Sequence, residues 1–145
     1  MITIVIVGAG LAGMSAAYEL RAVLGATSRI TVVGEGDRFS FTPSNPWLAV
    51  GWRKPEEITL DVARHLHEKD IAFDGSGVQR IDAERRQLHA GSSAVLDYDF
   101  LLICTGPKLA FDEVPGTGPH GGHTQSICTT PHAQQAWTAY ERFLT

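Results

Sequence analysis

The sequence predicts an α/β domain with a central parallel sheet and a small antiparallel meander inserted into it. Two apolar runs without alternation, Ile2–Val7 and Phe100–Cys104, are typical of strands that are buried on both faces. A glycine cluster separates the first run from a helical pattern, and three short strand-like segments with turns between them predict the meander. With 43% hydrophobic and 19% charged residues, the composition is ordinary for a globular chain, and we expect one domain over residues 1–145.

The N-terminal part of the sequence predicts a β-α-β unit followed by a loop. The expected strand, helix and second strand are Ile2–Val7, Leu11–Leu24 and Arg29–Val33. The helix has apolar residues on one face and ends at Gly25. The next segment, Phe39–Trp52, is aromatic and contains Pro43 and Pro46, so we expect an irregular loop there.

The rest of the sequence predicts a short helix, a meander, a buried strand and a final helix. These expected elements are a helix within Thr59–Lys69, a strand at Ile71–Phe73, meander strands at Val78–Ile81, Gln87–His89 and Ala94–Tyr98, and a strand at Phe100–Cys104. A Pro- and Gly-rich stretch follows. Thr130 is predicted to cap the last helix, with Pro131 in the first turn and apolar residues along one face as far as Leu144.

The glycines between the first strand and the first helix form the pattern G-x-G-x-x-G at Gly8, Gly10 and Gly13. Such glycines allow a tight turn, a close approach of a pyrophosphate to the backbone, and close packing of helix on strand. Leu11 and Ala12 lie in the first helical turn, whose free N–H groups favour phosphates. The pattern predicts a dinucleotide site, and a purely structural glycine turn is the alternative.

A dinucleotide site of this kind usually has an acidic residue at the end of the second strand, where it binds the ribose. Here Gly34 takes that position and Glu35 follows one residue later. A shift by one residue turns a strand side chain to the opposite face. Glu35 is therefore either a ribose ligand that reaches round the turn or an exposed turn carboxylate.

The segment Leu96–Gly106 resembles the second fingerprint of the glutathione-reductase-like FAD family, in which an apolar strand ends in an Ala-Thr-Gly turn against the flavin. Cys104 stands where alanine is usual, and Thr105 and Gly106 complete the turn. The resemblance implies a Rossmann-like FAD-binding domain with FAD as its cofactor. It also implies that Thr105 and Gly106 lie near the flavin and that Val78 lies near the adenine.

Three further segments resemble the bacterial sulfide:quinone oxidoreductases. They are Pro43-Ser44-Asn45-Pro46-Trp47 with Val50-Gly51-Trp52, Thr105–Phe111 with Val114-Pro115-Gly116, and Gln125–Thr129 followed by His132 and Ala133. This resemblance implies that Pro43 and Asn45 lie near the flavin and that Cys128 is a catalytic cysteine. It implies sulfide and a quinone as the substrates of the full enzyme, with sulfide oxidised through a cysteine persulfide.

Cys128 also has an interpretation from its own surroundings. It precedes the last helix, whose N-terminus favours a thiolate, and His132 is close enough in sequence to accept a proton from it. The alternative is a half-buried cysteine that packs under the loop. Cys104 is expected in the core. The spacing of His120, His123, Cys128 and His132 fits no standard zinc pattern, so we expect no metal site.

Members of the resembled family have further redox cysteines, a second dinucleotide-type domain and a C-terminal membrane-docking region, none of which lies in these 145 residues. We therefore expect the N-terminal part of a two-domain flavoprotein that is catalytically incomplete by itself and binds FAD weakly. An exposed half-interface should favour a homo-oligomer. Two other interpretations remain open: an NADH:quinone-type FAD oxidoreductase with an inert Cys128, and a non-catalytic nucleotide-binding or assembly module.

Charge and hydropathy exclude other partners. The net charge is −4 and no basic stripe is present, which argues against nucleic acid. We expect no signal peptide, because Met1 leads directly into the first apolar strand. No apolar run approaches the roughly 18 residues of a membrane span. The expected location is cytoplasmic, with peripheral attachment to the membrane in the full-length enzyme.

Overall fold

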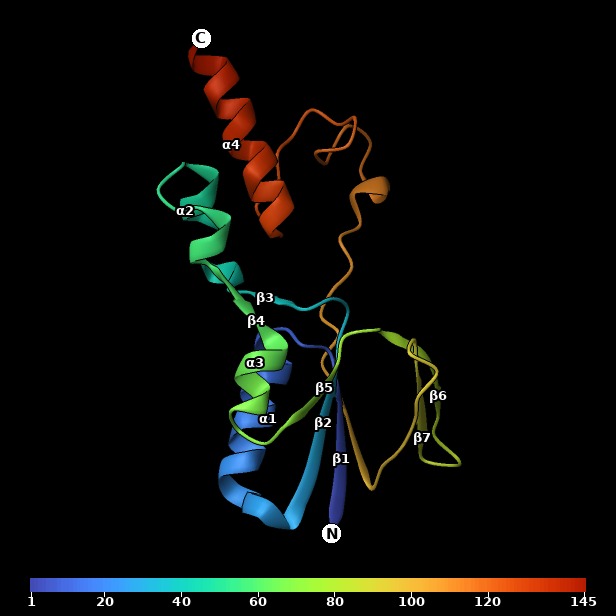
Figure 1. Ribbon diagram of the computed structural model, residues 1–145. Coiled ribbons are helices and arrows are strands. Elements are labelled where there is room, and N and C mark those ends of the chain that lie inside the picture. The colour runs from blue at the N-terminus through green and yellow to red at the C-terminus, as the bar shows by residue number, and fades with distance from the viewer. The chain divides into compact units, whose positions relative to one another are not determined.

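The chain is divided into two compact units. The computed structural model describes residues 1–145. Unit 1 comprises Met1–Phe39 and Asp61–Gly106, and unit 2 comprises Ser40–Leu60 and Pro107–Thr145 (Figure 1). The chain therefore passes from one unit to the other three times, after Phe39, after Leu60 and after Gly106.

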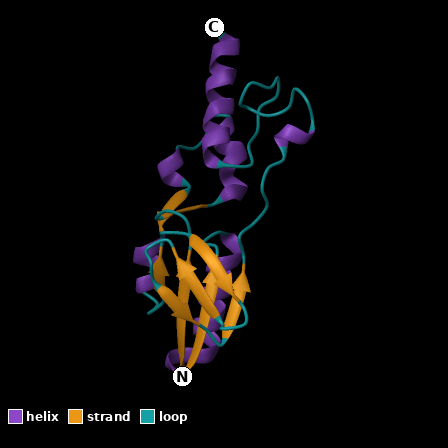
Figure 2. Cartoon of the chain, turned by 90° about the vertical axis from the view of Figure 1, so that its right-hand side faces the viewer, coloured by secondary structure: helices purple, strands orange, loops and turns teal.

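The centre of unit 1 is a parallel sheet of four strands in the order β5-β2-β1-β9. Figure 2 shows the strands of the chain in orange. These strands are β1 (Ile2–Val7), β2 (Ser28–Val33), β5 (Ala72–Asp74) and β9 (Phe100–Ile103). The predicted parallel sheet is confirmed, since all three pairings are parallel. β1 and β2 are in register from Ile2↔Ser28 to Val7↔Val33, so both strands end at the same edge of the sheet.

Helices α1 (Leu11–Leu24) and α3 (Val62–His67) cover one face of this sheet (Figure 1). The buried residues on this face are Ile4, Ile6, Met14, Ala17, Ile30, Val32, Phe39, Val62, Leu66 and Ile71. The bounds predicted for α1 are correct. The helix predicted within Thr59–Lys69 begins later than its first residue, because Asp61 caps α3 by accepting the N–H of Arg64 at 2.7 Å. Thr59–Asp61 instead forms β4, which pairs with β3 (Arg38–Ser40).

The predicted meander is confirmed and packs on the other face of the sheet. Its strands β6 (Val78–Asp82), β7 (Gln87–Ala90) and β8 (Val95–Asp97) are antiparallel and adjacent in that order. The buried residues between meander and sheet are Val5, Val7, Val33, Leu88 and Ala90. Because alternate side chains of β1 point to opposite faces, this strand supplies both hydrophobic clusters.

The last strand, β9, differs from its prediction. It is an edge strand with β1 as its single neighbour, and Phe100 and Ile103 are 58% and 64% exposed. An apolar run predicts a strand, but it does not say whether a layer covers each face. Cys104, expected in the core, is half-buried and packs against the cluster under α1.

Unit 2 contains two packed helices, α2 (Asn45–Ala49) and α4 (Thr130–Leu144), which lie side by side in Figure 1. Leu48, Ile58 and Ala133 form their buried apolar contact. The irregular loop predicted for Phe39–Trp52 is therefore partly wrong. Pro46 is the second residue of α2, where a missing N–H leaves no hydrogen bond unmade, so the proline favours this short helix.

The cap of α4 also differs by one residue from its prediction. Thr129, and not Thr130, is the N-cap, and its hydroxyl accepts the N–H of His132 at 3.3 Å. Pro131 lies in the first turn as predicted. Among the helices of the chain, none combines the length and the apolar character that crossing a membrane requires.

Candidate functional site

The glycine loop that follows β1 is shaped by close backbone contacts. Gly8 has φ 105°, and its N–H donates to the carbonyl oxygen of Val33 at 2.7 Å. A Cβ at Gly8 would overlap the carbonyl oxygen of Cys104, and a Cβ at Gly13 would overlap that of Gly8. Gly8 and Gly13 are therefore required by the packing of the loop against β9 and α1.

Gly10 has a different role, because it faces open space. No atom lies within 4 Å of the position that its Cβ would take. Gly10 is the N-cap of α1 and no side chain caps the helix, so the first-turn N–H groups of Leu11 and Ala12 are available. Both residues are exposed. The result is a bare backbone at a helix N-terminus, which fits the pyrophosphate of a dinucleotide.

Thr105 and Gly106 lie beside this loop. The N–H of Cys104 donates to the carbonyl oxygen of Val7 at 2.7 Å, so β9 ends where β1 ends. Thr105 and Gly106 follow directly and are exposed, and Gly106 has φ 73° with open space around it. Ligands of open parallel sheets bind outside the carboxyl ends of the strands, and both predicted fingerprints meet at that edge.

The carboxyl end of β2 explains why a glycine takes the position expected for the acidic residue. Gly34 is buried, and a Cβ there would lie 2.7 Å from the Cβ of Ala9 in the glycine loop. The acid is displaced to Glu35, which is exposed and forms a β-bridge with Ser76. Its Cγ lies 3.3 Å from the position of a Cβ on Gly77, next to the start of β6.

Unit 1 thus contains most of the predicted cofactor residues near the carboxyl edge of its sheet. These residues are Gly8, Gly10, Leu11, Ala12, Gly13, Glu35, Val78, Thr105 and Gly106. Val78 is half-buried at the first position of β6 and packs on the cluster between meander and sheet. The remaining predicted residues, Pro43, Asn45, Cys128 and His132, belong to unit 2.

The segment that leads into α4 carries an exposed thiol. The N–H of Cys128 donates to Ser126 Oγ at 3.2 Å, and the same oxygen lies 3.2 Å from His132 Nδ1. Ser126 Oγ, which accepts the Cys128 N–H, can either donate to Nδ1 or accept from it, depending on the tautomer of His132. The thiol of Cys128 makes no hydrogen bond to His132, so the serine is the residue that links the two.

Asn45 supports this segment from α2. Its side chain is 0% exposed, its Nδ2 donates to the carbonyl oxygen of Ile127 at 2.9 Å, and its Oδ1 accepts the hydroxyl of Thr130 at 3.4 Å. Ser126 and Thr130 are buried as well, at 7% and 9% exposure. Buried polar groups thus hold the backbone on both sides of the exposed Cys128. Pro43 is exposed in the short 3-10 turn before α2.

Sequence reasoning missed the residues that support the predicted ones. They are Ser126 and Thr130 in unit 2, and Asp74, Ser76 and Ser92 in unit 1. Small polar residues are common in loops for many reasons, so nothing in the sequence separates these from their neighbours. Their partners lie up to 85 residues away in the chain.

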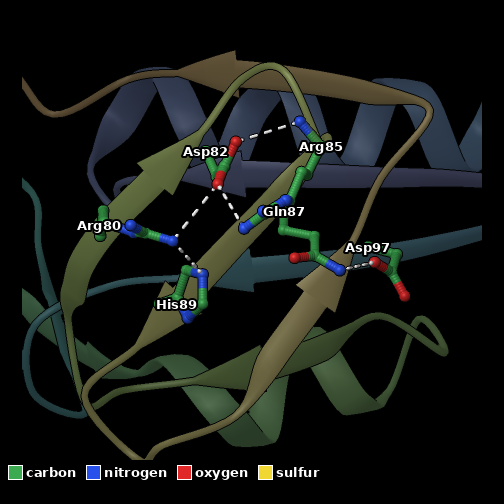
Figure 3. A network of polar contacts seen from close by, with 6 residues as sticks. All are labelled: Arg80, Asp82, Arg85, Gln87, His89 and Asp97. Carbon is green, nitrogen blue, oxygen red and sulfur yellow. Dashed lines mark hydrogen bonds and ion pairs between the residues drawn. The ribbon is translucent and has the colours of Figure 1, made fainter.

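The outer face of the meander carries a separate polar network (Figure 3). Asp82 lies 3.3 Å from Arg80 and 3.7 Å from Arg85, and Gln87 donates to Asp97 at 2.9 Å. His89 Nε2 lies 3.2 Å from Arg80 Nη2. The arginines are largely exposed, and such surface pairs contribute little to stability. This network is not included in the candidate site.

Comparisons with known proteins identify the family of this chain. The family model described as pyridine nucleotide-disulphide oxidoreductase matches residues 2–141. The sulfide-quinone reductase of Aquifex aeolicus (strain VF5) is 36% identical over 130 residues, which are 90% of this chain and 29% of that protein. The rhodocoxin reductase of Rhodococcus erythropolis is 30% identical over 124 residues, 83% of this chain and 29% of that protein.

A solved structure shows the same relationship. The sulfide:quinone oxidoreductase of the hyperthermophilic bacterium Aquifex aeolicus superposes with a TM-score of 0.87 at 33% sequence identity, covering 99% of this chain and 32% of that one. The chain thus spans about a third of the length of such relatives. Proteins of the matched family bind FAD, and the bare backbone at Gly10 fits the pyrophosphate of that cofactor. The chain belongs to the pyridine nucleotide-disulphide oxidoreductase family.

Proposed function

We propose that this chain is the FAD-binding portion of a flavoprotein oxidoreductase that oxidises sulfide through Cys128 and passes the electrons via FAD to a quinone. The observation that carries the proposal is the exposed thiol of Cys128 on a segment whose buried polar groups hold its backbone. Similarity to a sulfide-quinone reductase over 90% of the chain supports the choice of substrates.

The residues of unit 1 would hold the cofactor. Gly10 leaves room for the pyrophosphate, and the N–H groups of Leu11 and Ala12 would donate to its oxygens. Glu35 would accept hydroxyl groups of the ribose, and Val78 would lie near the adenine. Thr105 and Gly106 would lie near the flavin, as would Pro43 of unit 2. FAD, when bound, supplies the two-electron acceptor that oxidation of sulfide requires.

The residues of unit 2 would handle sulfur. Attachment of the sulfur of hydrogen sulfide to the Cys128 thiol as a persulfide releases two electrons and two protons. The thiolate is the reactive form of a cysteine, and the exposure of Cys128 gives a small anion access to it. His132 would accept a proton at Nε2 in the tautomer whose Nδ1–H donates to Ser126 Oγ, and this bond would fix the orientation of the ring. Asn45, whose amide group forms hydrogen bonds with Ile127 and Thr130, would position the segment that contains Cys128.

The test is the visible spectrum of the full-length protein on addition of sulfide. We expect sulfide to bleach the flavin band of the wild type and to leave the band of Cys128→Ser unchanged, because only the wild type can bind the sulfur. Cys104→Ser is the matched control, since Cys104 is the half-buried cysteine of unit 1 and should not be required. Bleaching of Cys128→Ser at the wild-type rate would refute the role of this thiol.

The same measurement distinguishes the other interpretations. A flavin that NADH bleaches and sulfide does not would support an NADH:quinone-type enzyme with an inert Cys128. A colourless protein that takes up no added FAD would support a non-catalytic module. We expect the 145-residue chain by itself to bind only part of the added FAD and to show no sulfide-dependent reduction of a quinone.

A further inference from the structure

A closed group of hydrogen bonds surrounds Asp74, the last residue of β5. Its Oδ1 accepts the N–H of Ser76 at 2.9 Å and the hydroxyl of Ser76 at 2.5 Å. Its Oδ2 accepts the hydroxyl of Ser92 at 2.6 Å, and the N–H of Ser92 donates to Ser76 Oγ at 2.7 Å. Asp74, Ser76 and Ser92 thus connect the end of the parallel sheet with the turn between β7 and β8.

The backbone of this segment is paired with the residues that follow β2. The N–H of Gly34 donates to the carbonyl oxygen of Asp74 at 2.9 Å, and the N–H of Gly36 donates to that of Gly75 at 2.8 Å. The N–H of Gly77 donates back to the carbonyl oxygen of Gly34 at 2.8 Å. Residues 74–77 therefore flank Glu35 on the side towards the meander.

Gly77 is the point at which this arrangement meets the side chain of Glu35. The Cγ of Glu35 lies 3.3 Å from the position of a Cβ on Gly77, so a side chain there would crowd the side chain of Glu35. The carbonyl oxygen of Gly77 accepts the N–H of Gly91 at 2.9 Å, directly before Ser92. The position of Gly77 is thus fixed from β2 and from the meander at once.

We propose that Asp74 is a positioning residue for the adenosine half of the cofactor: with Ser76 and Ser92 it fixes residues 74–77 and so places Glu35 and Val78 to receive the ribose and the adenine. The proposal rests on the proposed role of Glu35. A carboxylate is needed because both of its oxygens accept hydrogen bonds here, three in all. An amide has only one oxygen, and its NH2 group cannot accept a hydrogen bond. The bonds from Ser76 and Ser92 hold the pKa of the Asp74 carboxyl below its usual range, which supports a charged group here.

The test is the affinity of the chain for ADP, the part of FAD that this region would contact, measured by isothermal titration calorimetry. Asp74→Asn should bind ADP about tenfold more weakly, the effect of losing one hydrogen bond to a charged group. Ser92→Ala removes one of the three bonds to Asp74, together with the long 3.4 Å bond from the N–H of Ala94, and provides a milder second variant should Asp74→Asn fold poorly. Asp97→Asn is the matched control, because this exposed meander carboxylate bonds to Gln87 and not to the site.

A double-mutant cycle shows whether Asp74 acts through Glu35. If Asp74 acts through Glu35, adding Asp74→Asn to Glu35→Gln should weaken ADP binding little further. If the two residues act independently, the fold-losses in affinity of the two single variants should multiply in the double variant. A purely stabilising role would lower the thermal midpoint and leave the ADP affinity of the folded protein unchanged. Wild-type affinity in Asp74→Asn, or fully multiplicative effects, would overturn the inference. A wild type that binds no ADP would instead refute the proposed FAD site.

Discussion

Replacing Asn45 with alanine should destabilise unit 2 and release the Cys128 segment. The side chain of Asn45 is fully buried and joins α2 to Ile127, which precedes α4, and to Thr130, the first residue of α4. Alanine at this position keeps the helix but leaves the carbonyl oxygen of Ile127 without its partner. A buried polar group that loses its partner costs more than the hydrogen bond contributed when it was made.

The size of the effect follows from the two distances. The bond to Ile127 is 2.9 Å long and should contribute about 1 to 1.5 kcal/mol, whereas the bond from Thr130 is 3.4 Å long and should contribute about 0.5 kcal/mol or less. The space left by the amide group adds up to about 1 kcal/mol. The free energy of unfolding of unit 2 should therefore fall by about 2 to 3 kcal/mol.

Tryptophan fluorescence during urea titration measures this quantity selectively. Trp47, Trp52 and Trp137 all lie in unit 2, and unit 1 has no tryptophan, so the signal reports the unfolding of unit 2. Thr130→Val removes only the long hydrogen bond and is the matched control, with an expected loss below about 1 kcal/mol. The reasoning is refuted if Asn45→Ala unfolds within about 0.5 kcal/mol of the wild type, or if both variants lose the same amount.

Three further predictions follow from single positions. Gly10→Ala should fold like the wild type, because its Cβ meets no atom, yet it should bind FAD at least about tenfold more weakly. Gly13→Ala should lose both the fold and the binding of FAD, because its Cβ would overlap the carbonyl oxygen of Gly8. Thermal melts and titration with FAD distinguish the two variants. Gly51→Ala should destabilise unit 2 by about 2 kcal/mol in the urea assay, because Gly51 has φ 73° and its Cβ would lie 2.6 Å from the ring of Trp137. The pKa of Asp74 is lowered in the folded protein, so its carboxylate stabilises the fold above the unfolded pKa of about 4, and this stabilisation is lost as the pH falls through the lower folded pKa. Between about pH 5 and pH 3, the melting temperature of Asp74→Asn should therefore fall less than that of the wild type. Equal slopes of melting temperature against pH would refute this prediction.

The sequence predicts the first half of unit 1 closely, because local signals there agree with the tertiary structure. A β-branched run, a glycine cluster and Gly25 as helix end predict the bounds of β1 and α1 without error. The position of the predicted phosphate site follows from the same signals. The shape of this site depends on close backbone contacts, such as that of Gly13 with Gly8. These contacts are possible only because glycines occupy these positions of the pattern.

Features that depend on distant partners could not be predicted. The exposure of β9 depends on whether another layer covers it, and the apolar sequence Phe100–Ile103 is the same in either case. The hydrogen bonds of Asn45 reach residues 82 and 85 positions away, which no local signal in the sequence indicates. No change of composition marks the boundaries of unit 2 at Ser40, Leu60 or Pro107, so its discontinuity was not foreseen.

The three passages of the chain between its units set an order for folding during synthesis. All strands of unit 1 have been made once Gly106 leaves the ribosome, but α2 is made about 80 residues before α4. At roughly 5 to 20 residues per second, that is a delay of about 4 to 16 seconds. During this interval Leu48 lacks Ala133, its buried neighbour. Aggregation of the nascent chain should therefore begin at α2, and a chaperone that holds newly made chains would bind there first.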